Sequence, residues 1–149
     1  MKRVYLKKKM GSLVGIDFGT KRTGLACTDA KKIIASGLKN LPTIEVIPFL
    51  KNYCKDIDVE AFIIGKPLQR DGSPAQVESK IDLFIKKLEK NFPSKNIERH
   101  DERFTSKMAL QAIKLGGLKK KKRSDKGLID KVSATLILQS YLNFKINRL

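Results

Sequence analysis

The sequence predicts an α/β fold in which helices cover both faces of a mixed five-stranded sheet. Three observations predict it: short β-compatible runs follow one another near the start, runs of helical spacing then alternate with further strands, and the final segment is a long helical pattern. Because crossovers between parallel strands are right-handed and cover the sheet, this order places helices on its faces. A length of 149 residues, 41% of them hydrophobic, suits a single core.

The predicted strands are short. The first ends in a carboxylate, and a turn at Asp29 and Ala30 separates the second from the third. The apolar run AFIIG has the pattern of a central strand covered on both faces, and a loop over residues 66–74 follows it. The five predicted strands cover residues 12–17, 23–28, 32–35, 61–65 and 97–101.

The predicted helices carry apolar residues three and four positions apart. Pro42 and Thr43 mark the start of the first helix, Pro93 follows the second, and Gly116 and Gly117 provide a C-cap for the third. The four predicted helices cover residues 42–53, 77–88, 104–115 and 128–145.

No linker or internal repeat divides the chain, so we expect one domain over residues 1–149, with residues 1–11 as a basic lead-in. The lead-in lacks the apolar region of a signal peptide, and no apolar run approaches the ~18 residues of a membrane-spanning helix. Cys27 and Cys54 stand far apart and outside any CxxC pair, which argues against a zinc site or a disulfide framework. These features predict a cytoplasmic protein without a membrane partner.

The charge is strongly positive, since 32 Lys and Arg residues against 15 Asp and Glu residues give a formal net charge of +17. Such a surface attracts polyanions and releases their condensed counterions, so nucleic acid is the expected partner. Seven basic residues and one acid, Asp125, lie between Lys114 and Lys126. The alternative for this run is a solvated, lysine-rich surface. The candidate nucleic-acid contacts within it are Lys119, Lys120, Lys121, Lys122 and Arg123.

Asp17 is a candidate catalytic residue, because a carboxylate at the end of an apolar strand is costly to bury without a positive partner. The alternative is a turn-capping aspartate bonded to the amides of Gly19 and Thr20. Asp101 and Glu102 end the last strand, and strand parity directs them to opposite faces. At least one of these two should therefore reach the sheet edge near the first strand.

Asp130 lies in the first turns of the last predicted helix. Its small neighbours Ser133 and Ala134 would let the helix approach the sheet and bring the carboxylate beside Asp17. The alternative is a partner of the helix dipole. Three converging acids repel one another unless divalent cations bind between them, and carboxylate oxygens suit Mg²⁺ or Mn²⁺. This pattern indicates phosphodiester hydrolysis with two metal ions ~4 Å apart.

Other chemistries find little support in the sequence. His100 is the only histidine, and its mid-strand position favours a structural role over a catalytic triad or a histidine-rich metal site. No GxxxxGK[ST] or GxGxxG loop is present, so nucleotide binding by those loops is not expected. Lys21, Arg22 and Arg103 are candidates for phosphate contacts.

A family resemblance rests on four segments. These are GIDFGTKRTGLACTD (15–29), IIGKPLQRDGSPAQ (63–76), DERFTS (101–106) and KKKRSDKGLIDKVSATLILQSYL (120–142). In this order and at these spacings they resemble the YqgF/RuvX family, described as pre-16S rRNA nucleases and earlier as Holliday junction resolvases. The resemblance spans nearly the whole chain and implies an RNase H-like, three-layer fold.

By this resemblance Asp17, Glu102 and Asp130 are the catalytic, metal-binding acids. A fourth acid, frequent in RNase H-like resolvases, stays open between Asp101 and Asp125, and with it the number of metal ions. Lys66 stands where the family usually has an apolar residue, and it adds a candidate phosphate contact. The other family motif positions are Thr20, Lys21, Arg22, Asp71, Gly72 and Arg103.

The first function implied is a metal-dependent nuclease that processes the 5′ end of pre-16S rRNA in ribosome biogenesis, with ribosomal particles as possible partners. The alternatives are a Holliday junction resolvase acting on DNA in recombination and repair, and a non-catalytic RNA-binding ribosome-assembly factor. Phosphate contacts fix position and not identity, and no aromatic base-reading module separates RNA from junction DNA. A dimer would suit symmetric junction cleavage, whereas a monomer would suit a processing nuclease.

Overall fold

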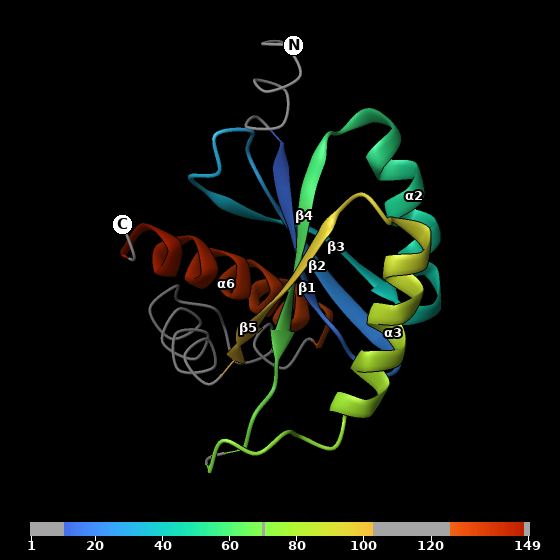
Figure 1. Ribbon diagram of the computed structural model, residues 1–149, viewed down its shortest axis with the longest axis vertical. Coiled ribbons are helices and arrows are strands. Elements are labelled where there is room, and N and C mark those ends of the chain that lie inside the picture. The colour runs from blue at the N-terminus through green and yellow to red at the C-terminus, as the bar shows by residue number, and fades with distance from the viewer. Residues whose placement is uncertain (1–10, 70, 103–125, 148–149) are drawn as a thin grey trace.

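A computed structural model describes residues 11–69, 71–102 and 126–147, and within the last range the side chains of residues 132–145. Its sheet has the order β3-β2-β1-β4-β5 (Figure 1). The first three strands form an antiparallel meander, and β4 and β5 continue the sheet in parallel with β1. The strands are β1 (Ser12–Asp17), β2 (Arg22–Thr28), β3 (Ala35–Pro42), β4 (Val59–Lys66) and β5 (Asn96–Asp101).

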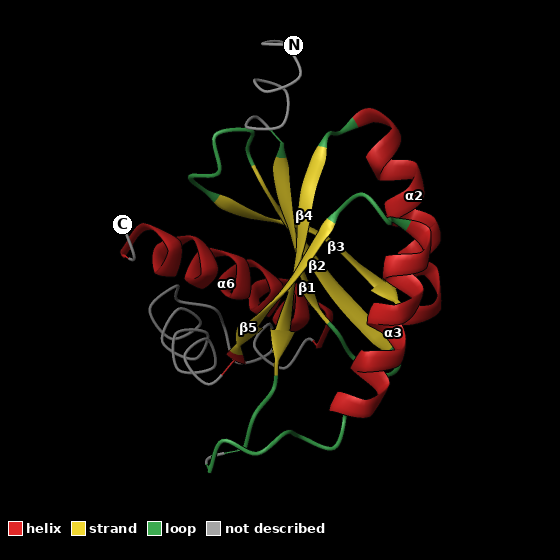
Figure 2. Cartoon of the chain, in the orientation of Figure 1, coloured by secondary structure: helices red, strands yellow, loops and turns green. Residues whose placement is uncertain are grey.

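Helices lie on both sides of this sheet, as the sequence predicts (Figure 2). Two of them cover one face and α6 crosses the other, so the described chain forms three layers. None of the described helices is long and apolar enough to cross a membrane. The helical elements are the 3-10 turn η1 (Thr43–Glu45), α2 (Val46–Asp56), α3 (Glu78–Asn91) and α6 (Lys126–Asn147).

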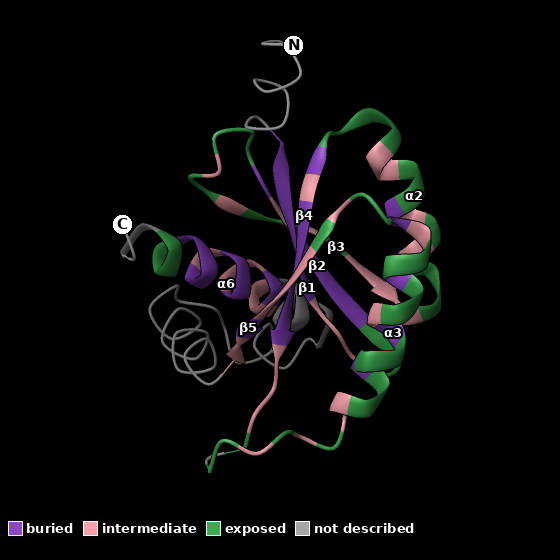
Figure 3. Ribbon diagram, in the orientation of Figure 1, coloured by how far each residue is buried: buried purple, intermediate pink, exposed green. Residues whose placement is uncertain are grey.

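Two apolar clusters hold these layers together, and Figure 3 shows that the central strands are largely buried. Alternate residues of one strand point to opposite faces, so β1 and β4 contribute to both clusters. Val14, Ile16, Phe62 and Ile64 face α2 and α3. Leu13, Ala61 and Ile63 face α6, where they meet Ala134, Leu138, Tyr141 and Leu142.

The predicted third strand is wrong in position, since β3 begins at Ala35 and residues 29–34 form a turn. The Asp29 carboxylate accepts hydrogen bonds from the amides of Ile33 at 2.9 Å and Ile34 at 3.3 Å. Lys32 takes a positive φ of 58° within this turn. The actual strand is an edge strand with many polar, exposed residues, so hydrophobicity did not mark it.

The other described elements confirm the predicted ones with shifts of a few residues at their ends. The first predicted helix divides into η1 and α2. The predicted helix over residues 104–115 and the basic run after it lie outside the described residues.

Gly15 sets how closely α6 approaches the sheet. A Cβ atom at this position would lie 2.9 Å from Leu138 Cβ and 3.1 Å from the Ala134 carbonyl oxygen. The missing side chain therefore allows α6 to pack directly on β1. Asp17 follows Gly15 by two residues and so shares the sheet face on which α6 lies.

Candidate active site at the carboxyl edge of the sheet

Two of the predicted acids meet where β1 and β5 end. Asp17 is the last residue of β1, and Glu102 comes directly after β5. Their carboxyl groups share a hydrogen bond. Of the two candidates left open by strand parity, Glu102 is thus the one that the structure joins to Asp17. Two residues separated by most of the chain are in direct contact at one edge of the sheet.

Gly65, in β4 between those two strands, makes room for Glu102. A Cβ atom here would lie 2.6 Å from Glu102 Oε1 and 2.8 Å from its Cδ and Cγ atoms. The glycine therefore forms the floor on which the Glu102 side chain rests. Gly65 was not among the predicted site residues, because its role depends on a neighbour far away in sequence.

Burial, together with neighbouring negative charge, changes the titration of Glu102. Burial is the largest cause and raises the pKa of Glu102 above its ordinary value, because it penalises the charged form. The hydrogen bond with Asp17 and the positive charge of Arg99 oppose this rise, whereas the charges of Glu78 and Asp101 add to it. A cation at this edge would favour the charged form of both carboxyl groups.

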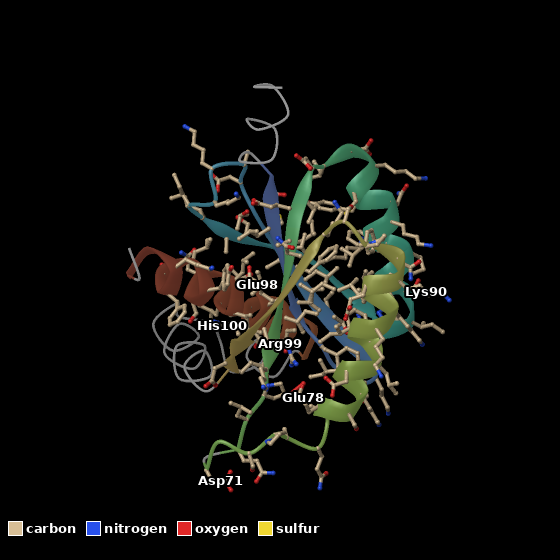
Figure 4. All side chains as sticks on the ribbon, viewed as in Figure 1. Asp71, Glu78, Lys90, Glu98, Arg99 and His100 are labelled. Carbon is tan, nitrogen blue, oxygen red and sulfur yellow. The ribbon has the colours of Figure 1, made fainter. Side chains whose placement is uncertain are left out.

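An ion pair borders the two acids. Arg99 Nη1 lies 2.6 Å from Glu78 Oε1, and Arg99 Nη2 donates a hydrogen bond of 3.0 Å to the Gly65 carbonyl oxygen. Figure 4 shows Arg99 on β5 and Glu78 at the start of α3. Sequence reasoning missed this pair. Its only signal was a charged residue in β5 at a position that strand alternation directs toward the α3 face.

The loop after β1 presents three of the predicted site residues, of which Lys21 and Arg22 are the candidate phosphate contacts. Thr20, Lys21 and Arg22 are all exposed beside the end of β1. The Thr43 hydroxyl donates a 2.5 Å hydrogen bond to the Gly19 carbonyl oxygen, and the Thr43 amide donates one of 2.9 Å to the Lys21 carbonyl oxygen. These bonds fix the loop next to Asp17. The Gly19 amide donates a hydrogen bond of 3.4 Å to the Thr23 hydroxyl.

Lys66 lies at the same edge. It is the last residue of β4, is half-buried, and pairs in register with Asp101. Parallel strands end at one edge of a sheet, so this lysine is carried to the same side of the molecule as Asp17. The backbone of Lys66 therefore lies at the same sheet edge as the loop after β1.

The remaining predicted acids are not placed by side chain. Asp130 lies in α6, four residues before Ala134. Its side chain is not among those that the structure describes. Among the side chains that are described, no group of three or more His, Cys, Asp or Glu residues could hold a metal ion. The other predicted site residues outside the described part are Arg103, Lys119, Lys120, Lys121, Lys122, Arg123 and Asp125.

Three other residues singled out in the sequence have structural roles. His100 is buried, and its Nε2 atom lies 2.8 Å from the Ser140 hydroxyl oxygen. Its ring meets the Tyr141 ring edge-on, and burial lowers the pKa of His100. Asp71 caps a turn by accepting hydrogen bonds from the amide and hydroxyl of Ser73, at 2.9 Å and 2.6 Å. Gly72 in that turn has a φ of 89°, which favours glycine.

The sheet order, with helices on both faces, defines the class of RNase H-like α/β folds. Thermus thermophilus RuvC in complex with Holliday junction substrate has this fold, with a TM-score of 0.58 and 14% sequence identity. Thermus thermophilus RuvC in a second structure gives a TM-score of 0.55 and 12% identity. Each comparison covers 91% of this chain and 96% of the RuvC chain.

Within that class the chain belongs to the RuvX family, described as Holliday junction resolvase, whose family model matches residues 11–144. A protein of Christiangramia forsetii named "Putative pre-16S rRNA nuclease" is 52% identical over 89% of this chain and 98% of its own length. One of the same name from Flavobacterium psychrophilum is 49% identical over 92% of this chain and 100% of its own length. These matches confirm the family expected from the four sequence segments.

Proposed function

We propose that this protein is a metal-dependent nuclease that hydrolyses phosphodiester bonds at the 5′ end of pre-16S rRNA. The observation that carries the proposal is the hydrogen-bonded pair of Asp17 and Glu102 at the carboxyl edge of the sheet. The name shared by several relatives, over nearly the full length of the chain, supports the RNA substrate. We place its action in the cytoplasm, together with that RNA and with ribosomal particles.

The donor atoms at this edge fit Mg²⁺ or Mn²⁺, which prefer carboxylate oxygens. Asp17 and Glu102 would hold the ion, and we propose Asp130 as the third ligand because it lies one helical turn before Ala134, which packs on Gly15. A bound ion supplies an activated water and offsets the charge that develops on the phosphate. The pKa of Glu102, raised in the protein alone, fits a carboxylate that gains its counter-charge from such an ion.

The residues around the acids would position the RNA backbone. Thr20, Lys21 and Arg22 offer exposed donors on a loop that Thr43 holds in place, and Lys66 offers another at the end of β4. Phosphate contacts of this kind set the register of the chain against the metal without reading bases. We propose that Arg103 and the run Lys119, Lys120, Lys121, Lys122 and Arg123 extend this basic surface.

A second candidate function is Holliday junction resolution. It is favoured by the description of the family and by the overall fold shared with RuvC. The same acids and the same metal would serve either substrate, because both reactions hydrolyse a phosphodiester bond. A non-catalytic RNA-binding ribosome-assembly factor is the third candidate, and it would keep the basic surface without cleavage.

The test is cleavage of a pre-16S rRNA fragment and of a four-way DNA junction, side by side, in Mn²⁺ and in EDTA. We expect cleavage of the RNA in Mn²⁺, none in EDTA, and loss with Asp17→Asn. Asp82→Asn, which removes an exposed carboxylate from α3, is the matched control and should keep full activity. Cleavage of the junction alone would favour the resolvase, and binding of RNA without cleavage would favour the assembly factor. Activity that survives in EDTA would contradict the metal-dependent mechanism.

A further inference from the structure

The ion pair between Glu78 and Arg99 is largely shielded from solvent. The Glu78 side chain is 12% exposed and that of Arg99 is 23% exposed. The pair is short, with Arg99 Nη1 2.6 Å from Glu78 Oε1. Removing one partner of a buried ion pair leaves an uncompensated charge, which costs free energy. Each of these two charges therefore stabilises the other.

The same arginine lies next to the proposed metal ligand. Arg99 Nη2 donates to the carbonyl oxygen of Gly65, the glycine whose missing side chain makes room for the Glu102 carboxylate. The guanidinium and the Glu102 carboxylate are therefore anchored on one residue of β4. The charge of Arg99 is one of those that act on the Glu102 carboxyl group. Arg99 has two acidic neighbours and forms its ion pair with Glu78.

The ion pair of Glu78 and Arg99 does not use all of its hydrogen-bonding atoms. Within the described part of the chain, Arg99 Nε is buried without a hydrogen-bond partner, and neither buried carboxylate oxygen of Glu78 makes a hydrogen bond of good geometry. An arginine that served only to brace α3 against the sheet would be expected to satisfy these atoms. The arrangement instead leaves Arg99 with the capacity to pair with a second carboxylate.

We propose that Glu78 acts as a positioning residue that holds Arg99 away from Glu102 and so keeps Glu102 available to a divalent cation. This inference rests on the proposed function. A guanidinium paired directly with Glu102 would occupy carboxylate oxygens that the metal ion needs, and it would add a positive charge beside the ion. Glu78 competes for the arginine and prevents this inhibitory pairing.

The proposal predicts a characteristic pattern in two variants. Glu78→Gln removes the competing charge, releases Arg99 toward Glu102, and should weaken Mn²⁺ binding by roughly tenfold, the scale of outer-shell substitutions at metal sites. Glu78→Gln combined with Arg99→Gln removes the released arginine too and should restore Mn²⁺ affinity to near that of the unmodified protein. A role of Glu78 as a metal ligand predicts no such restoration.

The measurement is a Mn²⁺ titration followed by electron paramagnetic resonance, with melting temperatures recorded for every variant. Asp82→Asn, an exposed acid on the same helix, controls for loss of a surface charge. Unchanged Mn²⁺ affinity in Glu78→Gln, or a double variant as weak as the single one, would overturn the proposal. If Glu78→Gln fails to fold, Glu78→Asp keeps the charge but retracts it, and it should weaken Mn²⁺ binding in the same direction; unchanged affinity would overturn the proposal.

The same titration separates this inference from the proposed function. If Mn²⁺ binds the unmodified protein and Asp17→Asn abolishes that binding, the metal site stands whatever Glu78 does. If Mn²⁺ does not bind, or binds equally well to Asp17→Asn, the metal site itself fails and the positioning role falls with it.

Discussion

The face of the sheet covered by α6 has acids at both ends, and the two ends treat them differently. Away from the carboxyl edge, Glu60 pairs with Lys32, while Glu98 accepts a 2.5 Å hydrogen bond from the Tyr141 hydroxyl and lies 3.8 Å from Lys145. Figure 4 shows Glu98 at a distance from Glu78. At the carboxyl edge Asp17 and Glu102 hydrogen-bond to each other, and the charge of Arg99 also acts on Glu102.

Under the proposed function, this difference separates a structural use of acids from a catalytic one. Around the cavity of about 310 Å³ that Lys32, Glu60, Glu98 and Lys145 help to line, each acid has a basic neighbour. Such pairing removes the cost of placing a carboxylate against the sheet. At the carboxyl edge, burial and like charges make the ionised carboxyl groups costly in free energy. Local conflicts of this kind occur mainly at functional sites.

The largest effect should come from Gly65→Ala. A methyl group 2.6 Å from Glu102 Oε1 must displace that carboxylate, and a misplacement of about 1 Å in a catalytic group costs roughly 10²-fold in rate. We expect cleavage to fall by about that factor, measured at saturating Mn²⁺. Gly37→Ala, at an exposed position of β3, is the control and should cleave normally. Equal activity of the two variants would mean that Glu102 has no role at the metal.

Gly15→Ala tests the packing that connects the two ends. Its methyl group would meet Leu138 Cβ at 2.9 Å and push α6 from β1, so we expect a loss of about 1–3 kcal/mol in the free energy of unfolding. Urea denaturation measures it. Stability equal to that of the unmodified protein would show that α6 does not depend on this close approach.

At the end of the sheet where Glu60 and Glu98 have basic neighbours, Tyr141→Phe removes the hydroxyl that donates to Glu98. We expect a loss of about 1 kcal/mol in the free energy of unfolding, with cleavage unaffected. Urea denaturation and the precursor cleavage assay check the two halves of this prediction. A fall in cleavage without a fall in stability would assign this end a functional role and erase the contrast.

The smallest effect concerns pH. Because the pKa of Glu102 in the folded protein is raised above its ordinary value of 4.5, the folded state loses stability as pH rises from 4.5 through the raised pKa, and this loss persists at higher pH. Glu102→Gln removes this penalty, so in EDTA its melting temperature should exceed that of the unmodified protein at pH 7 but not at pH 4. Glu98→Gln should show no such gain, since Glu98 is already paired. A gain in Glu98→Gln alone would reverse the comparison.

The sequence predicted the parts of this molecule that depend on local pattern. Apolar runs marked β1 and β4, helical spacing marked α3, and the carboxylate after an apolar strand marked Asp17. The position of the polar edge strand β3 was not predicted correctly, because it depends on pairing with β2 and not on the hydrophobicity of β3 itself. The described part of the fold was therefore predictable except where tertiary pairing overrides composition.

The site was predictable only in part. Asp17 and Glu102 were expected to meet and do so, although parity alone left Asp101 as an alternative. Gly65 and the Glu78–Arg99 pair were missed, because their importance arises from neighbours 20 or more positions away that only the folded chain brings together. No pattern within a single strand or helix contains that information.

The most direct test of the central claim is anomalous diffraction from a crystal soaked in Mn²⁺. We predict a manganese peak between the carboxylates of Asp17 and Glu102 that disappears in Asp17→Asn. A peak at the paired end near Glu98, or none at the carboxyl edge, would contradict the account.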